Sequence, residues 1–323
     1  MVGMDFSAAL SALNKFLQTH PNKVVVAFQD HDLIPMREFF VQETMWQMLK
    51  TNGFTDSFIE LSPSQRTVYD QLVSFYALTK DVPQKPGLDP AQVLQTKYKV
   101  AAQYAAEKNG LRTTFVDQGI SSYPFGQQQA FNNYNALVSR AWGNYIRVKR
   151  INLNSMSIEA QADAFAAFIR AIINTSEGAE IKQALERYKG LEYVHLARVE
   201  DEATGKFVQE CVPKAEGRIW LNYGSAHFTP CGVHTYLDNP LLLKIYIDRT
   251  HYLSEQASIK NRDVLPGAQP KPAWEKSYVL LLKEGELFES PAQSVPPDRI
   301  AAEREDWLTR TKAAKQRIPA QGR

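Results

Sequence analysis

The strongest constraint on the fold is an alternation of short apolar runs with longer amphipathic segments. The first apolar run, residues 23–28, is rich in β-branched side chains and follows residues 5–19, whose apolar side chains recur at helical spacing. Alternating strands and helices are typical of a largely parallel sheet with helices on its faces. The sequence therefore predicts an α/β fold with a mostly parallel central sheet. Further strands are expected at 56–61, 113–117, 193–199, 218–223, 242–247 and 278–282, and further helices at 39–53, 64–79 and 91–109.

The middle of the chain departs from this plan. Residues from about 126 to 188 show helical periodicity only, which predicts a helical insertion. We expect one α/β domain over residues 1–290, with an N-terminal helix and this insertion, and a polar C-terminal tail over 291–323. Residues 254–275 are expected to form a loop. The interrupting residues there are Pro266, Gly267, Pro270 and Pro272.

Composition and charge narrow the functional class. Of the 323 residues, 44% are hydrophobic and 22% charged, the net charge is +2, and the basic residues are spread along the chain. This balance predicts a globular protein with a substantial core and argues against a nucleic-acid partner. No run approaches the ~20 apolar residues of a membrane span, and Cys211 and Cys231 form no metal or disulfide motif. A soluble, cytoplasmic protein is expected. Secretion without a visible signal peptide is the alternative.

Polar residues that follow the expected strands are the candidates for catalysis. Asp30 and His31 follow the first strand, and Glu60, Asp117 and His227 follow later ones. Because ligands of open α/β sheets bind outside the carboxyl ends of strands, we expect these side chains to share one crevice. Histidine transfers protons near neutral pH, and a carboxylate orients it or acts as the base. The pattern favours a hydrolytic site. The competing interpretation is that each histidine is a structural residue with its hydrogen bonds satisfied and that Glu60 is a helix cap or a salt-bridge partner.

Other residues are weaker candidates for ligand contacts. Arg66 and Arg140 are candidates to bind an anionic group, with surface ion pairs as the alternative. His234 is a candidate to assist His227. Tyr223 could ligate haem iron through a phenolate, although a core role is simpler.

Metal and nucleotide cofactors have little support in the motifs. Suitable nitrogen and oxygen ligands for a metal are offered by His31, His227, Glu60 and Asp30. No His-x-x-x-His spacing fixes two ligands on one helix turn, so whether a metal binds is unknown at this point. Glycine-rich phosphate loops are absent, which argues against nucleotide binding.

Taken in order, the strand-end motifs resemble those of a known superfamily. Gln29-Asp30-His31 ends the first strand, Glu60 ends the second, and Gly224-Ser225-Ala226-His227 follows a late strand, with Cys231-Gly232-Val233 after it. Over about residues 22–283 this order is similar to that of the superfamily joining erythromycin esterases, ChaN haem-binding lipoproteins, the TIKI and TraB proteins and a domain of large bacterial toxins.

The resemblance implies a bacterial hydrolase that acts on an ester or amide bond of a small molecule or peptide. It also implies that the chain could be a toxin or effector domain. It implies proton transfer and oxyanion stabilisation by His31 and His227, water activation by Glu60, and orientation of a histidine by Asp30. Gln29 stands where many members have glutamate, and an amide cannot act as a base but can orient water or substrate. Asp117 joins Gln29 among the expected substrate contacts. The alternative is a non-catalytic binder of haem or another small molecule. The cofactor is unknown at this point: a hydrolase that needs none is expected, with haem or a divalent metal as the alternatives.

Overall fold

The computed structural model describes residues 4–30, 33–83, 90–118, 127–172, 175, 178–184, 186–187, 201–260, 272 and 274–317. Two compact units make up the chain. Unit 1 comprises Met1–Gly119, Glu200–Arg249 and Pro272–Val295, and unit 2 comprises Ile120–Val199, Thr250–Lys271 and Pro296–Arg323. The division into residues 1–290 and 291–323 remains a prediction.

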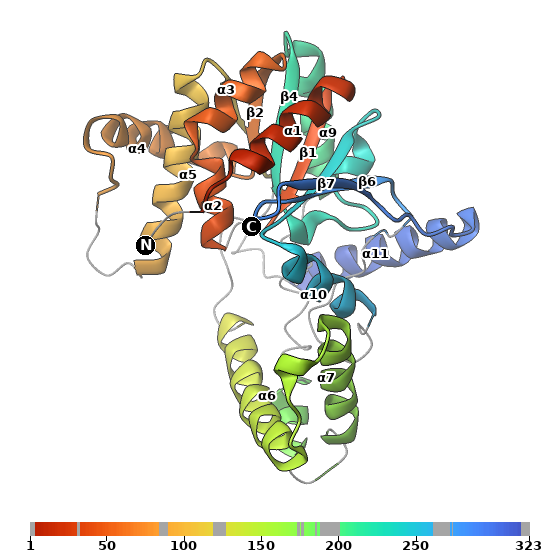
Figure 1. The fold of residues 1–323 in the computed structure, drawn as a ribbon. Coiled ribbons are helices and arrows are strands. Elements are labelled where there is room, and N and C mark those ends of the chain that lie inside the picture. Colours follow the sequence, from red (N-terminus) through yellow and green to blue (C-terminus); the bar gives the residue numbers. More distant parts are fainter. Residues whose placement is uncertain are drawn as a thin grey trace. The chain divides into compact units, whose positions relative to one another are not determined.

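A seven-stranded sheet in the order β3-β2-β4-β1-β5-β6-β7 forms the centre of unit 1 (Figure 1). Every described neighbouring pair is parallel except β6 and β7, which are antiparallel. This confirms the predicted α/β fold with a mostly parallel sheet. The strands are β1 (Val24–Gln29), β2 (Phe54–Ile59), β3 (Arg112–Phe115), β4 (Arg218–Gly224), β5 (Leu241–Tyr246), β6 (Ser277–Leu281) and β7 (Glu286–Ser290).

Strand β1 lies near the middle of the sheet and is buried along its whole length. Its alternate side chains enter two separate hydrophobic clusters, Val25 and Ala27 on one face and Val24, Val26 and Phe28 on the other. Burial on both faces explains the continuous β-branched run in the sequence.

Helices cover both faces of the sheet. The face of Val25 packs against α1 (Ser7–Thr19), α2 (Ile34–Phe40), α3 (Glu43–Thr51) and α5 (Pro90–Lys108). The face of Val26 packs against α9 (Asp201–Cys211) and the short helix η5 (Val233–Tyr236). Helix α4 (Arg66–Thr79) follows η1 (Pro63–Gln65) and contacts α5. The carboxyl ends of β2, β4 and β1 therefore open between two helical layers.

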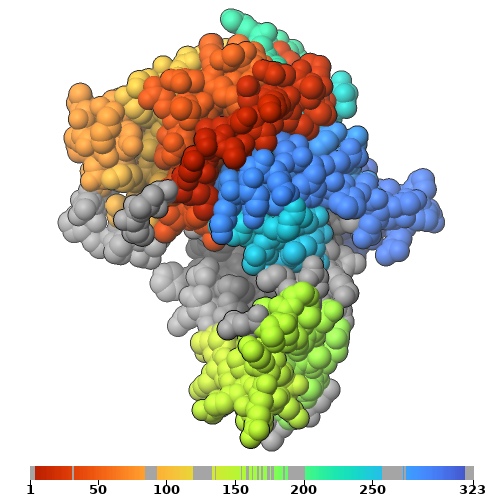
Figure 2. All heavy atoms as spheres, in the orientation of Figure 1, coloured from red at the N-terminus to blue at the C-terminus, as the bar shows by residue number. Residues whose placement is uncertain are grey.

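The β6–β7 hairpin was not expected from the sequence. Its turn depends on Gly285, which has a φ of +65° and leaves room for Ala8 of α1, because a Cβ there would lie 2.4 Å from the Ala8 Cβ. Helix α1 accordingly lies along the hairpin (Figure 2).

Two other expectations were wrong in detail. The single helix expected over 39–53 is two helices, α2 and α3, which Val41 and Gln42 separate. The loop expected over 254–275 begins as helix α10 (Arg249–Lys260), because the first proline of that stretch, Pro266, lies beyond the helix end. The strand expected at 193–199 lies outside the described residues.

The described part of unit 2 is helical. Helices α6 (Gln127–Lys149) and α7 (Ile158–Ile172) lie in the region of the expected insertion, with η2 (Leu153–Ser155) between them (Figure 1). They bury Tyr134, Val138 and Phe168 in a cluster of their own. Helix α11 (Pro297–Arg317) occupies much of the expected tail and buries Trp307. No described helix is both long and apolar enough to cross a membrane.

Candidate active site

Two of the predicted catalytic residues meet at the carboxyl ends of β2 and β4. Glu60 follows β2 directly, and His227 lies on η4 (Ser225–His227), which follows β4. The Glu60 Oε2 accepts a hydrogen bond from the backbone N–H of Gly224 at 2.5 Å. The Glu60 Oε1 lies 3.3 Å from the His227 Nε2. Because β2 and β4 are neighbours in the sheet, two short polar motifs far apart in sequence become contacts.

A third residue, Asp201, completes this arrangement. Its Oδ1 lies 2.7 Å from the Nδ1 of His227, and it comes from the first turn of α9. Asp201 is 4% exposed and the His227 side chain 15%. The imidazole thus lies between two carboxylates, with Asp201 on one ring nitrogen and Glu60 on the other. We call Glu60, His227 and Asp201 the carboxylate–histidine chain.

The charges of this chain favour a protonated histidine. Burial alone would lower the pKa of His227, but the attraction of Asp201 and Glu60 and the hydrogen bonds to them outweigh burial and raise this pKa well above its usual value. Near neutral pH the ring is therefore an imidazolium with both N–H groups available as donors.

Tyr223 lies against this chain but is held as a neutral phenol. Its side chain is 1% exposed, and its ring centroid is 4.5 Å from that of His227. Burial raises the pKa of Tyr223 well above its usual value, and the charges of Asp117, Glu60 and Asp201 raise it further, while a hydrogen bond with Thr204 opposes them. The expected substrate contact Asp117 thus acts electrostatically on this core tyrosine.

At Tyr223 and His227 these contacts compete with haem ligation, and the haem-binding alternative remains a prediction. Iron would need the Tyr223 phenolate, which burial and three carboxylates disfavour. It would otherwise need a free nitrogen of His227, and both nitrogens contact carboxylates. Among the described residues, no group of three or more His, Cys, Asp or Glu side chains could hold a metal ion.

Strand β1 ends beside this site. Gln29, its last residue, is 5% exposed, and the half-buried Asp30 accepts a backbone hydrogen bond from Leu33 at 3.2 Å. The orienting role expected of Asp30 remains a prediction, and for His227 Asp201 occupies that position. His31 lies outside the described residues.

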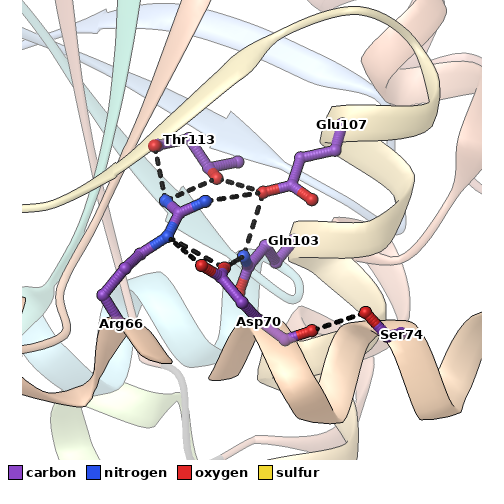
Figure 3. Close-up of polar contacts among 6 residues, drawn as sticks. All are labelled: Arg66, Asp70, Ser74, Gln103, Glu107 and Thr113. Atoms are coloured by element: carbon purple, nitrogen blue, oxygen red, sulfur yellow. Dashed lines mark hydrogen bonds and ion pairs between the residues drawn. The ribbon is translucent and has the colours of Figure 1, made fainter. Parts of the chain in front are cut away.

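Arg66 belongs to a polar network that joins α4, α5 and β3 (Figure 3). Its Nε lies 2.8 Å from the Asp70 Oδ1, its Nη1 donates to the backbone oxygen of Thr113 at 2.7 Å, and its Nη2 lies 3.3 Å from the Glu107 Oε1. All three guanidinium nitrogens are engaged within the protein. This geometry favours the ion-pair alternative over substrate binding.

The two remaining substrate candidates, Arg140 and His234, have carboxylate neighbours of their own. Arg140 belongs to unit 2, where its Nη2 lies 3.5 Å from the Glu180 Oε2. His234 is buried in unit 1, with its Nε2 2.5 Å from the Glu275 Oε2 although outside hydrogen-bond geometry, and its ring packs on Phe28 and Phe228. Gly232 allows this packing, because a Cβ there would lie 2.8 Å from the His234 ring.

A pocket opens on the α2–α3–α5 face of the sheet and reaches Glu60. It encloses about 680 Å³ of empty space, its mouth included. Glu60 therefore belongs both to the pocket and to the carboxylate–histidine chain. Polar side chains on three strands, Gln29, Ser57 and Asn222, and the aromatic side chains of Phe40, Trp46 and Tyr98 line it.

Sequence reasoning missed Asp201, Ser57 and Asn222. Asp201 carried a usable signal, because it closely follows the strand expected at 193–199, as Glu60 follows its own strand. Ser57 and Asn222 lie inside strands, where polar residues commonly alternate with apolar ones, so the sequence alone does not mark them as pocket residues.

Comparisons with known proteins assign no family. Neither a protein-family model nor a curated protein matches the chain. The structure of the type III effector HopBA1 is similar at 10% identity over 76% of this chain and 88% of its own, with a TM-score of 0.36. A protein from Bacillus cereus is similar at 14% identity over 77% of this chain and 72% of its own, with a TM-score of 0.37. The superfamily resemblance in the motifs remains a prediction.

Proposed function

We propose that this chain is a hydrolase of an ester or amide bond and that the carboxylate–histidine chain performs the reaction. The supporting observation is the position of His227, which lies between the Glu60 Oε1 at 3.3 Å and the Asp201 Oδ1 at 2.7 Å, while Glu60 also lines the pocket. An imidazole held by two carboxylates in a buried crevice supplies a base and an acid side by side.

In the proposed reaction, Glu60 accepts a proton from a water molecule as that water attacks the substrate carbonyl. The Nε2–H of His227 faces the same region, because it lies near the Glu60 carboxylate. It stabilises the oxyanion of the tetrahedral intermediate and then donates a proton to the departing alcohol or amine. Glu60 returns its proton to the imidazole, and the acid product leaves. Asp201 holds the ring in place through Nδ1.

The rival function, ligand binding without turnover, has less support. A binding site needs no proton relay, whereas here three ionisable groups, one buried and two partly buried, contact one another in sequence. Groups with shifted proton affinity gather at catalytic sites.

The test is hydrolysis of a panel of 4-nitrophenyl esters and amino-acid anilides by the full chain. Glu60→Gln and His227→Gln should each reduce kcat/KM for the best substrate by about 10²–10⁴-fold. The matched control is Glu202→Gln, an exposed acid on α9 that pairs with Lys206, and it should leave the rate unchanged. Wild-type rates in both site variants would end the proposal.

A further inference from the structure

Three buried side-chain oxygens in the pocket lack hydrogen-bond partners. They are the Gln29 Oε1, the Ser57 Oγ and the Asn222 Oδ1. Gln29 is 5% exposed and Ser57 is fully buried. Buried polar atoms almost always have partners, and leaving one without costs about 1–3 kcal/mol. Three such atoms in one pocket therefore point to a partner that enters from outside.

The register of the sheet places these side chains on the same face. Asn222 of β4 pairs with Ala27 of β1 and with Ile59 of β2. Gln29 lies two residues beyond Ala27, and Ser57 lies two residues before Ile59. Because side chains alternate along strands, the three side chains form a diagonal row across β1, β4 and β2 on the pocket side.

The oxygens of Gln29, Ser57 and Asn222 need hydrogen-bond donors on the ligand. Amide oxygens only accept hydrogen bonds, and the Ser57 hydroxyl accepts or donates. A group with several hydroxyl or amino hydrogens would satisfy all three oxygens. The aromatic walls of Phe40, Trp46 and Tyr98 suit the flat apolar faces of a ring.

We infer that the pocket binds a ring carrying several hydroxyl groups, of the saccharide or cyclitol class, with its hydroxyls on Gln29, Ser57 and Asn222. Arg37 and Lys99, which also line the pocket, have partners within the protein and are not needed for this assignment. Because Glu60 lines the same pocket, the bond to be cleaved joins this ring to an acyl group. This last step rests on the proposed function, whereas binding does not.

Ligand-observed NMR titration of the full chain tests the inference, with methyl α-D-glucopyranoside and myo-inositol as probes and cyclohexanol as the single-hydroxyl control. The two polyols should bind, and cyclohexanol should bind more weakly. Gln29→Met, Ser57→Ala and Asn222→Leu should each weaken polyol binding about tenfold, the effect of one lost hydrogen bond. Each should also keep or raise the melting temperature, because a buried polar atom without a partner is removed.

Ser277→Ala is the matched control for Ser57→Ala. Ser277 is equally buried and its Oγ also lacks a partner, but it lies on β6 and does not line the pocket. It should leave polyol binding unchanged. The inference is overturned if neither polyol binds up to its solubility limit, if binding is unaffected by the three pocket variants, or if Ser277→Ala weakens it equally.

Asp201→Asn separates this inference from the proposed hydrolysis, because Asp201 does not line the pocket. Retained polyol binding with lost ester hydrolysis supports both proposals. Polyol binding by a wild-type protein that hydrolyses none of the panel supports the pocket assignment and contradicts the hydrolase. Hydrolysis without polyol binding supports the hydrolase and overturns the substrate class.

Discussion

At the scale of single residues, the proton affinity of His227 is the property on which the account depends. A lone buried imidazole would be neutral, because burial disfavours its charge. Asp201 and Glu60 reverse that preference and raise its pKa. The same contacts place the imidazolium of His227, an acid, next to the carboxylate of Glu60, a base.

This raised pKa predicts a pH-dependent stability. Because the pKa of His227 is higher in the folded state, its charged form stabilises the fold fully below the unfolded-state value of about 6.5 and loses that effect as pH rises through the folded-state pKa. Urea unfolding of wild type and His227→Gln should therefore differ most below pH 6.5 and converge at higher pH. A difference that grows with pH would contradict the assignment.

At the scale of elements, Arg218 at the start of β4 fastens three chain segments together. Its guanidinium donates to the backbone oxygens of His20 at 2.6 Å, Asn22 at 2.9 Å and Leu17 at 3.1 Å, and it lies 4.4 Å from the Phe54 ring centroid. These contacts join the end of α1 to β1 and β2.

Arg218→Met should lower the free energy of unfolding by about 2–4 kcal/mol, because it leaves several partly buried carbonyl oxygens without a donor. Chemical denaturation measures this loss. Lys206→Met, which removes only an exposed i,i+4 ion pair with Glu202, should cost less than about 0.5 kcal/mol. Equal losses in the two variants would refute a fastening role.

The elements also show how far the sequence predicted the fold and site. Strands β1 to β6 were predicted, and the signal is plainest in β1 and β5, because central parallel strands are apolar on both faces. Strand β7 was not, because an antiparallel edge strand with half-exposed residues lacks that signal. Glu60 and His227 were predicted because each follows a strand, whereas Asp201 was missed although it lies in the first turn of α9, shortly after the strand expected at 193–199.

At the scale of the whole molecule, the route of the chain between its units is informative. The backbone N–H of Gln118 donates to the Thr204 Oγ1 at 3.0 Å, so the chain leaves unit 1 and returns to it at almost the same point. Segments inserted between neighbouring points are often removable without unfolding the host.

Replacing residues 120–199 with a Gly/Ser linker of about ten residues should therefore leave the sheet of unit 1 folded. Circular dichroism should show one cooperative thermal transition with strand and helix signals retained. A variant without cooperative melting would show that unit 1 needs residues inside 120–199, the predicted strand at 193–199 first among them.

The central claim is that Glu60, His227 and Asp201 act as one catalytic unit. The most direct measurement is kcat/KM for the best ester of the panel in Glu60→Gln, Asp201→Asn and the double variant. When two residues act as one unit, removing either one abolishes the contribution of both to kcat/KM. The double variant should therefore be about as slow as the slower single variant. Losses that multiply, or an unaffected Asp201→Asn, would contradict the account.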